Sequence, residues 1–554
     1  MYDVIIKNGT IVDGSGKKAY RADLGIINGK IMALDDLSQA KAEEVIDAKG
    51  KYVSPGFIDL TNISDSYLTL FTIPTLDSLV RQGITTILGG NEGISLAPLA
   101  TPATSKILKR IWISKRLPDI ILAPSKSLNI IESVARWLEL FGININWLTF
   151  KDYLKEIQKR GIACNFGSLV GYTSLRRGIT KEERDLTSEE MKALVNLISY
   201  AQDEGAFGLS FSFGHLFKDW LKTNELIEAA KIIGRKKKTV TFHLRDEGDR
   251  IKEALEEAIE IGKKTEAEIH ISHLKIKGKK NWHKANIVLA DISRASKEIP
   301  IYFDIYPYLD TFSDLSDCLP LWITRGGRKK MIKRLKDSEL RKKIVQDIEK
   351  QPIEYEKFTI VQSIYNKAYV GLSLGKIAEE KGYSVPEAII EVLLGGKGQI
   401  LCLNPCLSEE NLENFIKSPL STVSTSQAGF NLEYYRNLRY FKGGEQLVHP
   451  RCFGTFPRFL GKYVREKKLI SWEEAVYKIT ALPAERFGIR KRGVIKRGYL
   501  ADIVVFDPKI IIDRATYNNP FQYPRGIEYV LVNGEVVVRK SKHTGKLAGE
   551  VLRH

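Results

Sequence analysis

The segment Thr239-Val-Thr-Phe-His-Leu-Arg-Asp-Glu-Gly248 places a histidine at the end of a short β-rich run, directly before charged residues. The segment Glu268-Ile-His-Ile-Ser-His-Leu-Lys275 has the same arrangement about one strand–helix–strand unit later. Apolar, β-branched runs are typical of buried parallel strands, whose carboxyl ends form the mouth of a barrel. We therefore expect His243 and His273 on neighbouring strands, facing one mouth. The pair predicts a metal site, and the alternative is two core or surface histidines with satisfied hydrogen bonds.

Length and composition describe a multidomain globular protein. The chain has 554 residues, of which 43% are hydrophobic and 27% are charged. It contains no apolar run of about 18 residues, and its start lacks the pattern of a signal peptide. The five cysteines are scattered, which suits a reducing compartment. We therefore expect a cytoplasmic protein without a membrane partner.

The net charge of +18 is spread along the chain. Basic runs occur at residues 235–238, 275–280 and 325–330, but none combines with an aromatic stacking pattern or a nucleic-acid-binding motif. We interpret the charge as a solvated lysine-rich surface and do not expect nucleic acid as a partner. The sequence does not set the oligomeric state, and a homo-oligomer is compatible with it.

The two ends of the chain are both rich in short β-runs. Asn8-Gly9 and Asn28-Gly29 separate the first of them, and Asn-Gly is a strong hairpin signal. Similar runs occur at residues 501–507 and 527–538. Since a few short hairpins are marginal alone, we expect residues 1–53 and 485–554 to form one composite β-sandwich domain.

Residues 54–484 alternate strand-like with helical runs, the pattern of parallel α/β structure. Nine candidate strands begin near residues 57, 84, 162, 208, 240, 269, 301, 400 and 422. A closed barrel needs eight, so one belongs to a mostly helical insertion expected around residues 309–420. Among the helices, the clearest starts at Thr187-Ser-Glu-Glu190, a capping box.

Several motifs together resemble the amidohydrolase superfamily, and the nearest branch is the N-acyl-D-amino-acid deacylases, or D-aminoacylases. They are Val53-Ser-Pro-Gly-Phe-Ile-Asp59, Gln82-Gly-Ile-Thr-Thr86, Gly90-Asn-Glu-Gly-Ile-Ser-Leu-Ala-Pro98, Phe242-His-Leu-Arg-Asp-Glu-Gly248, Asp304-Ile-Tyr-Pro-Tyr308 and His449-Pro-Arg-Cys-Phe-Gly-Thr-Phe-Pro457. The resemblance covers essentially the whole chain. It implies a distorted (β/α)₈ TIM-like barrel with a small β-sandwich built from both termini, and metal-assisted hydrolysis of an amide C–N bond in a small-molecule substrate.

The resemblance also shows which metal ligands have changed. The family's His-x-His pair matches Thr61 and Ile63, its cysteine matches Glu92, and its aspartate on the last strand matches Ser426. One of two metal sub-sites has thus lost its ligands. The other retains Glu92, His243 and His273, a donor set known for catalytic zinc. We therefore expect one Zn²⁺ or similar divalent ion.

The resemblance assigns further residues to the site. Lys275, expected on the same side of an extended strand as His273, is the candidate catalytic lysine. Arg451 is the candidate clamp for a substrate carboxylate, with surface ion pairing as the alternative. Tyr306 and Tyr308 are candidate pocket residues, with packing as the alternative for Tyr308. The family's aspartate on the last strand usually acts as general base, and Ser426 stands in its place. The candidates for a general base in this chain are Asp65, Asp246, Glu247 and Asp304.

Two functions follow from these residues. The first is an N-acyl-amino-acid deacylase-like hydrolase with a single-metal site. The second is a catalytically inactive amidohydrolase-fold protein that serves as a binding or assembly scaffold. The retained ligands favour the first, and the lost ligands favour the second. The loop at residues 213–220 departs from the family pattern, so the sequence leaves substrate and stereospecificity open.

Overall fold

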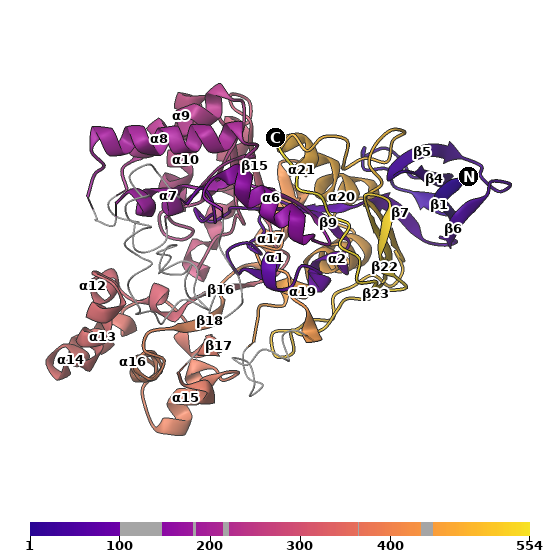
Figure 1. Ribbon diagram of the computed structural model, residues 1–554. Coiled ribbons are helices and arrows are strands. Elements are labelled where there is room, and N and C mark those ends of the chain that lie inside the picture. The colour runs from indigo at the N-terminus through magenta and orange to yellow at the C-terminus, as the bar shows by residue number, and fades with distance from the viewer. Residues whose placement is uncertain (100–146, 181–183, 214–220, 364, 434–446) are drawn as a thin grey trace.

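The computed structural model describes residues 1–99, 147–180, 184–213, 221–363, 365–433 and 447–554. The chain has a mixed α/β fold, and strands from the first 60 and the last 60 residues gather in a β-rich part at one side (Figure 1). The C-terminal end itself lies against the central part, where the His554 N–H donates to the Gly205 carbonyl at 3.2 Å. No helix in these ranges is both long and apolar enough to cross a membrane.

The β-rich part contains strands from both ends of the chain. β7 (Tyr52–Pro55) pairs antiparallel with β20 (Ile503–Phe506), far away in sequence. The first sheet has the strand order β5-β4-β1-β6, and the second has the order β23-β22-β21-β20-β7-β2-β3. Their other strands are β1 (Tyr2–Lys7), β2 (Thr10–Ile11), β3 (Tyr20–Arg21), β4 (Asp23–Ile27), β5 (Lys30–Asp35), β6 (Ala42–Asp47), β21 (Ile527–Val532), β22 (Glu535–Arg539) and β23 (Lys542–His543).

The side chains of β20 point alternately to its two faces, and in this way the strand joins the β-rich part to the rest of the molecule. Successive residues of a strand point to opposite faces. Ile503 and Val505 lie in the core shared by the two sheets of the chain ends. Val504 and Phe506 instead pack into the large core of the central α/β part. A single strand thus contributes to two cores.

The central part contains two sheets of parallel strands. The first comprises β8 (Phe57–Asp59), β9 (Ile84–Gly89) and β10 (Asn165–Ser168). The second comprises β11 (Val170–Gly171), β12 (Gly208–Ser212), β13 (Thr239–His243), β14 (Glu268–Ile271), β15 (Ile301–Ile305) and β19 (Ser421–Val423). A parallel bridge between Asn62 and Gln427 links the chain just beyond β8 to the chain just beyond β19.

Helices lie between successive parallel strands: α6 (Phe150–Arg160), α7 (Tyr172–Ile179), α8 (Ser188–Asp203), α9 (Thr223–Arg235), α10 (Ile251–Thr265) and α11 (Ala285–Ala295). After the last parallel strand, α20 (Trp472–Ile479) and α21 (Ala481–Arg486) precede β20. α8 begins at the predicted capping box, in which Thr187 and Glu190 each satisfy the other's backbone N–H. Its Leu194 and Ile198 are fully buried, so the apolar spacing of this helix faces the core.

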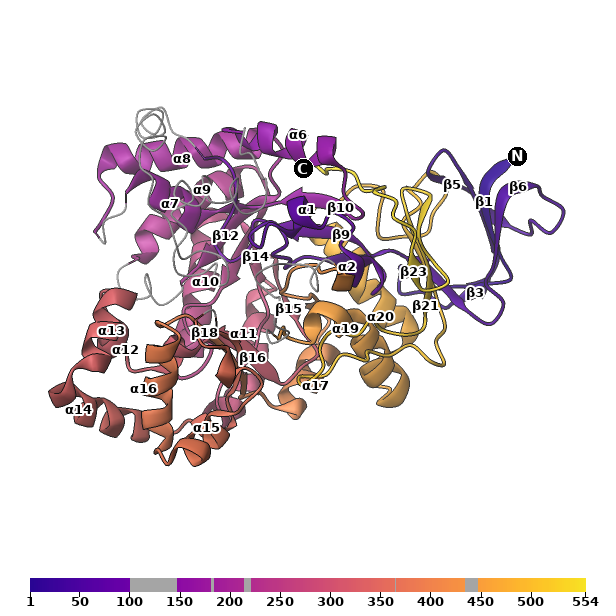
Figure 2. The same cartoon turned by 60° about the horizontal axis from the view of Figure 1, so that its bottom comes forward.

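The insertion forms a unit with a core of its own. Its sheet has the order β16 (Asp310–Asp314), β18 (Ile400–Pro405) and β17 (Thr359–Ser363), so the strand near residue 400 pairs with β16 and β17 and not with the parallel strands. Its helices are α12 (Leu321–Thr324), α13 (Arg328–Lys336), α14 (Ser338–Glu349), α15 (Leu374–Lys381) and α16 (Val385–Gly395), and α17 (Glu409–Lys417) leads back to β19. Figure 2 shows this unit at the opposite end of the molecule from β1 and β6.

Candidate active site

The structure brings together the three residues that the sequence singles out as metal ligands. Nδ1 of His243 lies 2.6 Å from one carboxylate oxygen of Glu92. Nε2 of His273 lies 2.6 Å from the other oxygen. One donor atom from each residue lies within 4.8 Å of the others, and no other such group of three occurs among the described residues. Two imidazoles and a carboxylate thus converge on one point.

Glu92 reaches this point through a tightly held turn after β9. Its backbone is left-handed, with φ of 56°. The buried Asp65 accepts the N–H of Gly90 at 2.7 Å. Asn91 donates its side-chain amide to the carbonyls of Leu60, at 3.0 Å, and Leu88, at 2.8 Å. Such fixed contacts allow a non-glycine residue to keep a conformation that is otherwise costly.

The crowding of this turn leads us to expect a large loss of stability in Gly90→Ala. Gly90 has φ of +71°, and a Cβ there would lie 2.0 Å from the Leu169 carbonyl oxygen. We expect the free energy of unfolding to fall by about 2–5 kcal/mol, the sum of left-handed strain and overpacking. Chemical denaturation measures this loss. Gly371→Ala is the control, because Gly371 has φ of +87° with open space around it. It should cost only about 1–2 kcal/mol; equal losses would argue against a crowded turn.

The two histidines reach Glu92 in different ways. His243 is the last residue of β13, in register with Ser212 on β12, as expected. His273 lies two residues beyond β14 in a left-handed turn with φ of 40°, and not on the strand itself. Asp304 stabilises this turn by accepting the His273 N–H at 3.0 Å. The imidazole rings meet edge to face, 4.7 Å between centroids.

The electrostatics of the metal-free site keep Glu92 ionised. Burial would raise the pKa of the Glu92 carboxyl, but the charges and hydrogen bonds of His243 and His273 hold it well below its usual range. Burial and the Lys275 charge lower the pKa of His273, and the Glu92 carboxylate and hydrogen bonds raise it more. A negative oxygen pair therefore faces two imidazoles.

Lys275 lies beside His273, but not as the other side chain of an extended strand. The left-handed turn at His273 ends the strand, and Lys275 folds back. Its Nζ lies 2.7 Å from Nδ1 of His273, 2.9 Å from the His273 carbonyl oxygen and 2.5 Å from Glu247. Glu247 also pairs with Lys277 at 2.6 Å and lies 3.2 Å from Nδ1 of His273. Glu247 is thus the centre of a buried ionic network behind His273.

Arg451, the first residue of α19 (Arg451–Arg458), lies against Tyr306 at the cavity wall. Its guanidinium carbon is 4.4 Å from the centre of the Tyr306 ring. The residue is only 6% exposed, yet no ion pair forms between Arg451 and any carboxylate of the described ranges. Its Nε and the Tyr306 hydroxyl are buried without a hydrogen-bond partner in those ranges. Such orphaned polar groups at a cavity wall are suited to an anionic ligand.

Tyr308, the second predicted pocket tyrosine, is not among the residues that line the cavity. It is buried behind the wall, and its hydroxyl donates to Asp513 at 3.1 Å. Arg458 lies over its ring, 4.7 Å from the centre. Tyr306 and Tyr308 would face the same side only if the segment stayed extended. The chain instead turns after β15. The structure therefore places Tyr308 in packing.

The four candidate bases occupy structural positions. Asp65 and Asp304 are fully buried and accept backbone N–H groups, from Gly90 and His273 respectively. Burial raises the pKa of Asp65 to about 6. Asp246 accepts the N–H groups of Gly248 and Arg250 just before α10. Glu247 lies in the ionic network. Each carboxylate has a protein partner that explains its position.

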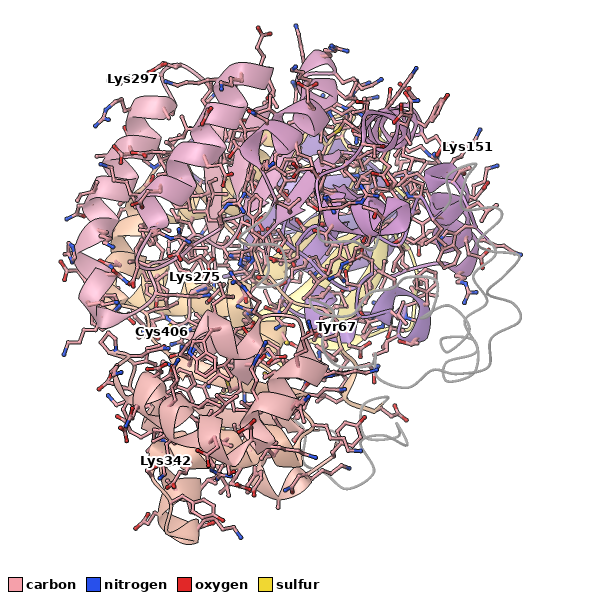
Figure 3. All side chains as sticks on the ribbon, turned by 90° about the vertical axis from the view of Figure 1, so that its left-hand side faces the viewer. Tyr67, Lys151, Lys275, Lys297, Lys342 and Cys406 are labelled. Carbon is pink, nitrogen blue, oxygen red and sulfur yellow. The ribbon has the colours of Figure 1, made fainter. Side chains whose placement is uncertain are left out.

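The cavity above the ligands has a volume of about 1310 Å³ and is walled by the parallel-strand ends and the insertion. Figure 3 shows Lys275, Cys406 and Tyr67 between the helices of the central part and those of the insertion. Tyr67 is a wall residue that sequence reasoning missed, because no local pattern marks a residue that meets its neighbours across the fold. Residues 214–220, part of the divergent loop, lie outside the described ranges.

The positions of the changed ligands border the same cavity. Ile63 and Ser426 line it, and Ser426 has a left-handed backbone with φ of 49°. Thr61 is fully buried and donates its hydroxyl to Asp304 at 2.6 Å. None of the three side chains is a strong metal ligand. These three positions therefore carry apolar and hydroxyl groups.

Comparison with known proteins places these features in a family. The amidohydrolase family profile matches residues 447–538. The chain is 30% identical to a D-aminoacylase of Alcaligenes xylosoxydans xylosoxydans over 555 aligned positions, which cover 100% of this chain and 97% of that protein.

Two solved structures show the same similarity over the whole chain. One is the N-acyl-D-glutamate deacylase of Bordetella bronchiseptica with zinc and a phosphonate inhibitor that mimics the tetrahedral intermediate, with a TM-score of 0.78, 28% identity and 100% of both chains covered. The other is a D-aminoacylase described for its binuclear metal centre, with one-metal activation and second-metal attenuation. It has a TM-score of 0.77 and 28% identity, and 100% of both chains is covered.

Proposed function

This chain belongs to the D-aminoacylase branch of the amidohydrolase family, and on that premise we propose that it hydrolyses the amide bond of an N-acyl amino acid with a single divalent metal ion. The observation that carries the proposal is the convergence of Glu92, His243 and His273 at the base of the cavity. In the alternative, an inactive scaffold, the hydrogen bonds of Glu92 to His243 and His273 would be the only reason for these side chains to meet.

The donor set fits a zinc ion. Glu92 offers one carboxylate oxygen, His243 offers Nδ1 and His273 offers Nε2, all close enough to reach one ion. Three protein ligands with an open position are the pattern of catalytic zinc sites. When bound, such an ion polarises a carbonyl and activates water. We infer one ion, because Thr61, Ile63 and Ser426 supply no ligand set for a second.

Glu247 and Lys275 would then determine which ring nitrogen of His273 carries the proton. With Nε2 as a ligand, the ring proton of His273 resides on Nδ1, where Glu247 at 3.2 Å can accept it. The Lys275 ammonium can no longer donate to that nitrogen and keeps its bonds to Glu247 and the His273 carbonyl. One of its three N–H groups is thereby freed at the cavity wall. We infer that this group contacts the substrate.

Arg451 is the proposed site for the substrate carboxylate. A guanidinium binds a carboxylate through two parallel hydrogen bonds. Tyr306 packs against the Arg451 guanidinium, and Tyr67 also lines the cavity wall. The α-carboxylate would fix the amino acid half of the substrate and so direct the amide towards Glu92, His243 and His273. A substrate without that charge should bind poorly.

The fold supports this arrangement. We infer that the nine parallel segments form a (β/α)₈ barrel, with β10 and β11 as one interrupted strand and the Asn62–Gln427 bridge as its closure. Active sites of such barrels lie at the carboxyl ends of the strands. His243 ends β13, and Glu92 and His273 follow β9 and β14.

The test is the metal content of protein purified without a metal-binding tag, by elemental mass spectrometry, combined with assays on N-acyl-D- and N-acyl-L-amino acids. We expect about one ion per chain, as for a three-ligand catalytic site, and release of the free amino acid. About two ions would show that a second ligand set exists. No metal after zinc addition, together with no hydrolysis, would support the scaffold.

A further inference from the structure

A fully buried aspartate, Asp304 on β15, connects three neighbouring segments below the metal ligands. One carboxylate oxygen accepts the Thr61 hydroxyl at 2.6 Å and lies 2.7 Å from Nε2 of His270. The other oxygen accepts the N–H of His273 at 3.0 Å. The carbonyl of Asp304 also accepts the N–H of Leu274 at 2.8 Å. The side chain of Asp304 thus holds the backbone at position 273, and its main-chain carbonyl holds the backbone at position 274.

The conformation of His273 requires such support. β14 ends at Ile271, and Ser272 donates its N–H to the Phe242 carbonyl at 2.9 Å. His273 then turns into the left-handed region, with φ of 40°. For a non-glycine residue this backbone costs on the order of 1–2 kcal/mol and persists only where surrounding contacts determine it. The turn directs Nε2 of His273 to Glu92, 2.6 Å away, instead of along the strand.

We propose that Asp304 is a positioning residue for the metal centre, which fixes His273 as a ligand by holding its backbone N–H in the left-handed turn. The inference rests on the proposed function, because it concerns a metal ligand of that site. Asp304 itself does not reach the cavity. Its effect is therefore transmitted through His273, and not through contact with substrate.

The hydrogen bonds of Asp304 also explain why an ionised aspartate suits this position. Its two oxygens accept three donors from two segments, the chain after β8 and the end of β14, and Thr61 and His270 fix the plane of the carboxylate. His270 is 2% exposed, and its Nδ1 has no partner among the described polar atoms, so its proton belongs on Nε2, facing Asp304. Thr61 and His270 thereby fix the orientation of the carboxylate oxygen that accepts the His273 N–H.

The barrel interior provides a matched comparison residue. Asp59 on β8 is also fully buried, and it bonds Thr425 and Asn62. Among the described residues its hydrogen bonds do not reach Glu92, His243 or His273. Removing Asp59 should therefore lower stability through the same kind of lost hydrogen bonds, without acting on a ligand. The pair separates a general contribution to folding from a specific one to the metal centre.

The experiment measures the dissociation constant for zinc of the wild type, Asp304→Ala, Asp304→Asn and Asp59→Ala, by competition with a chromophoric chelator. Thermal unfolding of the metal-free proteins is measured in parallel. Partners that orient ligands typically change metal affinity by about 10- to 100-fold when removed, and we expect a loss of that size in Asp304→Ala. Asp304→Asn retains an oxygen acceptor for the His273 N–H and should restore most of the affinity. Asp59→Ala should unfold at lower temperature with wild-type affinity.

The outcomes separate the two proposals. If the wild type binds no zinc, the proposed function fails. If the wild type binds zinc and Asp304→Ala binds it equally well, the positioning role is wrong. Equal losses in Asp304→Ala and Asp59→Ala would also overturn it. Should Asp304→Ala not fold, residue-resolved hydrogen exchange of the wild type decides, because the His273 amide must then be strongly protected; fast exchange would refute the role.

Discussion

Replacement of His243 by alanine is expected to reduce bound zinc from about one ion per chain to background and to abolish deacylation, because a catalytic zinc site needs its three protein ligands. His243 contributes Nδ1, and only Glu92 and His273 remain without it. The metal contributes several kcal/mol to catalysis, and 1.36 kcal/mol corresponds to a tenfold change in rate, so we expect a loss of at least about 10³-fold. Elemental analysis and an amino acid release assay measure both effects.

A second histidine serves as the control. His283 is exposed in the short helix Lys279–Lys284 and does not line the cavity. His283→Ala should retain both the metal and the activity. The His243 side chain is itself 29% exposed, so His243→Ala should fold normally, with a stability change of about 1 kcal/mol or less. An active, metal-free His243→Ala protein would refute the ligand assignment.

Arg451→Met should lower kcat/KM for N-acyl amino acids by between about 30-fold and several-thousandfold. Losing one partner of a buried charge pair costs about 2–5 kcal/mol, and each 1.4 kcal/mol is a factor of ten. Methionine retains an apolar stem that can pack on Tyr306 but offers no donor to a carboxylate. Steady-state kinetics with an N-acyl amino acid measures the loss.

The same variant makes an opposite prediction for stability. Arg451 is a buried charge, 6% exposed, and no carboxylate of the described residues forms an ion pair with it. Replacing such a charge with an apolar side chain is often neutral or stabilising. We therefore expect the melting temperature of Arg451→Met to equal or exceed that of the wild type. A large decrease would indicate a structural role.

Two controls isolate the carboxylate contact. The first is a substrate with an amidated α-carboxyl group, which wild type and Arg451→Met should hydrolyse at similar, low rates. The second is Arg294→Met on α11, where the arginine side chain is 73% exposed and pairs only with Asp291. It should leave the kinetics unchanged. Equal losses on the charged and the amidated substrate would place Arg451 elsewhere in the mechanism.

Local patterns in the sequence were sufficient for most elements. The apolar β-branched runs that end at His243 and near His273 correspond to β13 and β14, and the capping box at Thr187 begins α8. These features depend on neighbours one to four residues away, so periodicity and capping reveal them. The sequence led us to expect that both ends share one β-sandwich, because a few short hairpins are marginal alone. In the structure residues 2–47 form a four-stranded sheet by themselves, and the second sheet joins the two ends through β7 and β20.

The side-chain geometry of the site depended on contacts across the fold. Lys275 was expected beside His273 on an extended strand, but the left-handed turn held by Asp304 bends it back into the network of Glu247. Tyr308 was expected in the pocket, and its bond to Asp513 places it behind the wall. Each of these partners lies at least 28 residues away in sequence, as for Lys275 and Glu247, where no local pattern operates.

The sequence by itself determined which residues could bind a metal, because ligand chemistry belongs to the side chain: Glu92, His243 and His273 are present, and Thr61, Ile63 and Ser426 are not ligands of the usual kind. The tertiary structure alone decided that the first three meet at one point and that Arg451 lies at the cavity wall without an ion pair to any residue that the structure describes. The physical reason is that convergence is set by the ends of separate strands and by buried hydrogen bonds, such as that from His273 to Asp304, which close only when the whole sheet has formed.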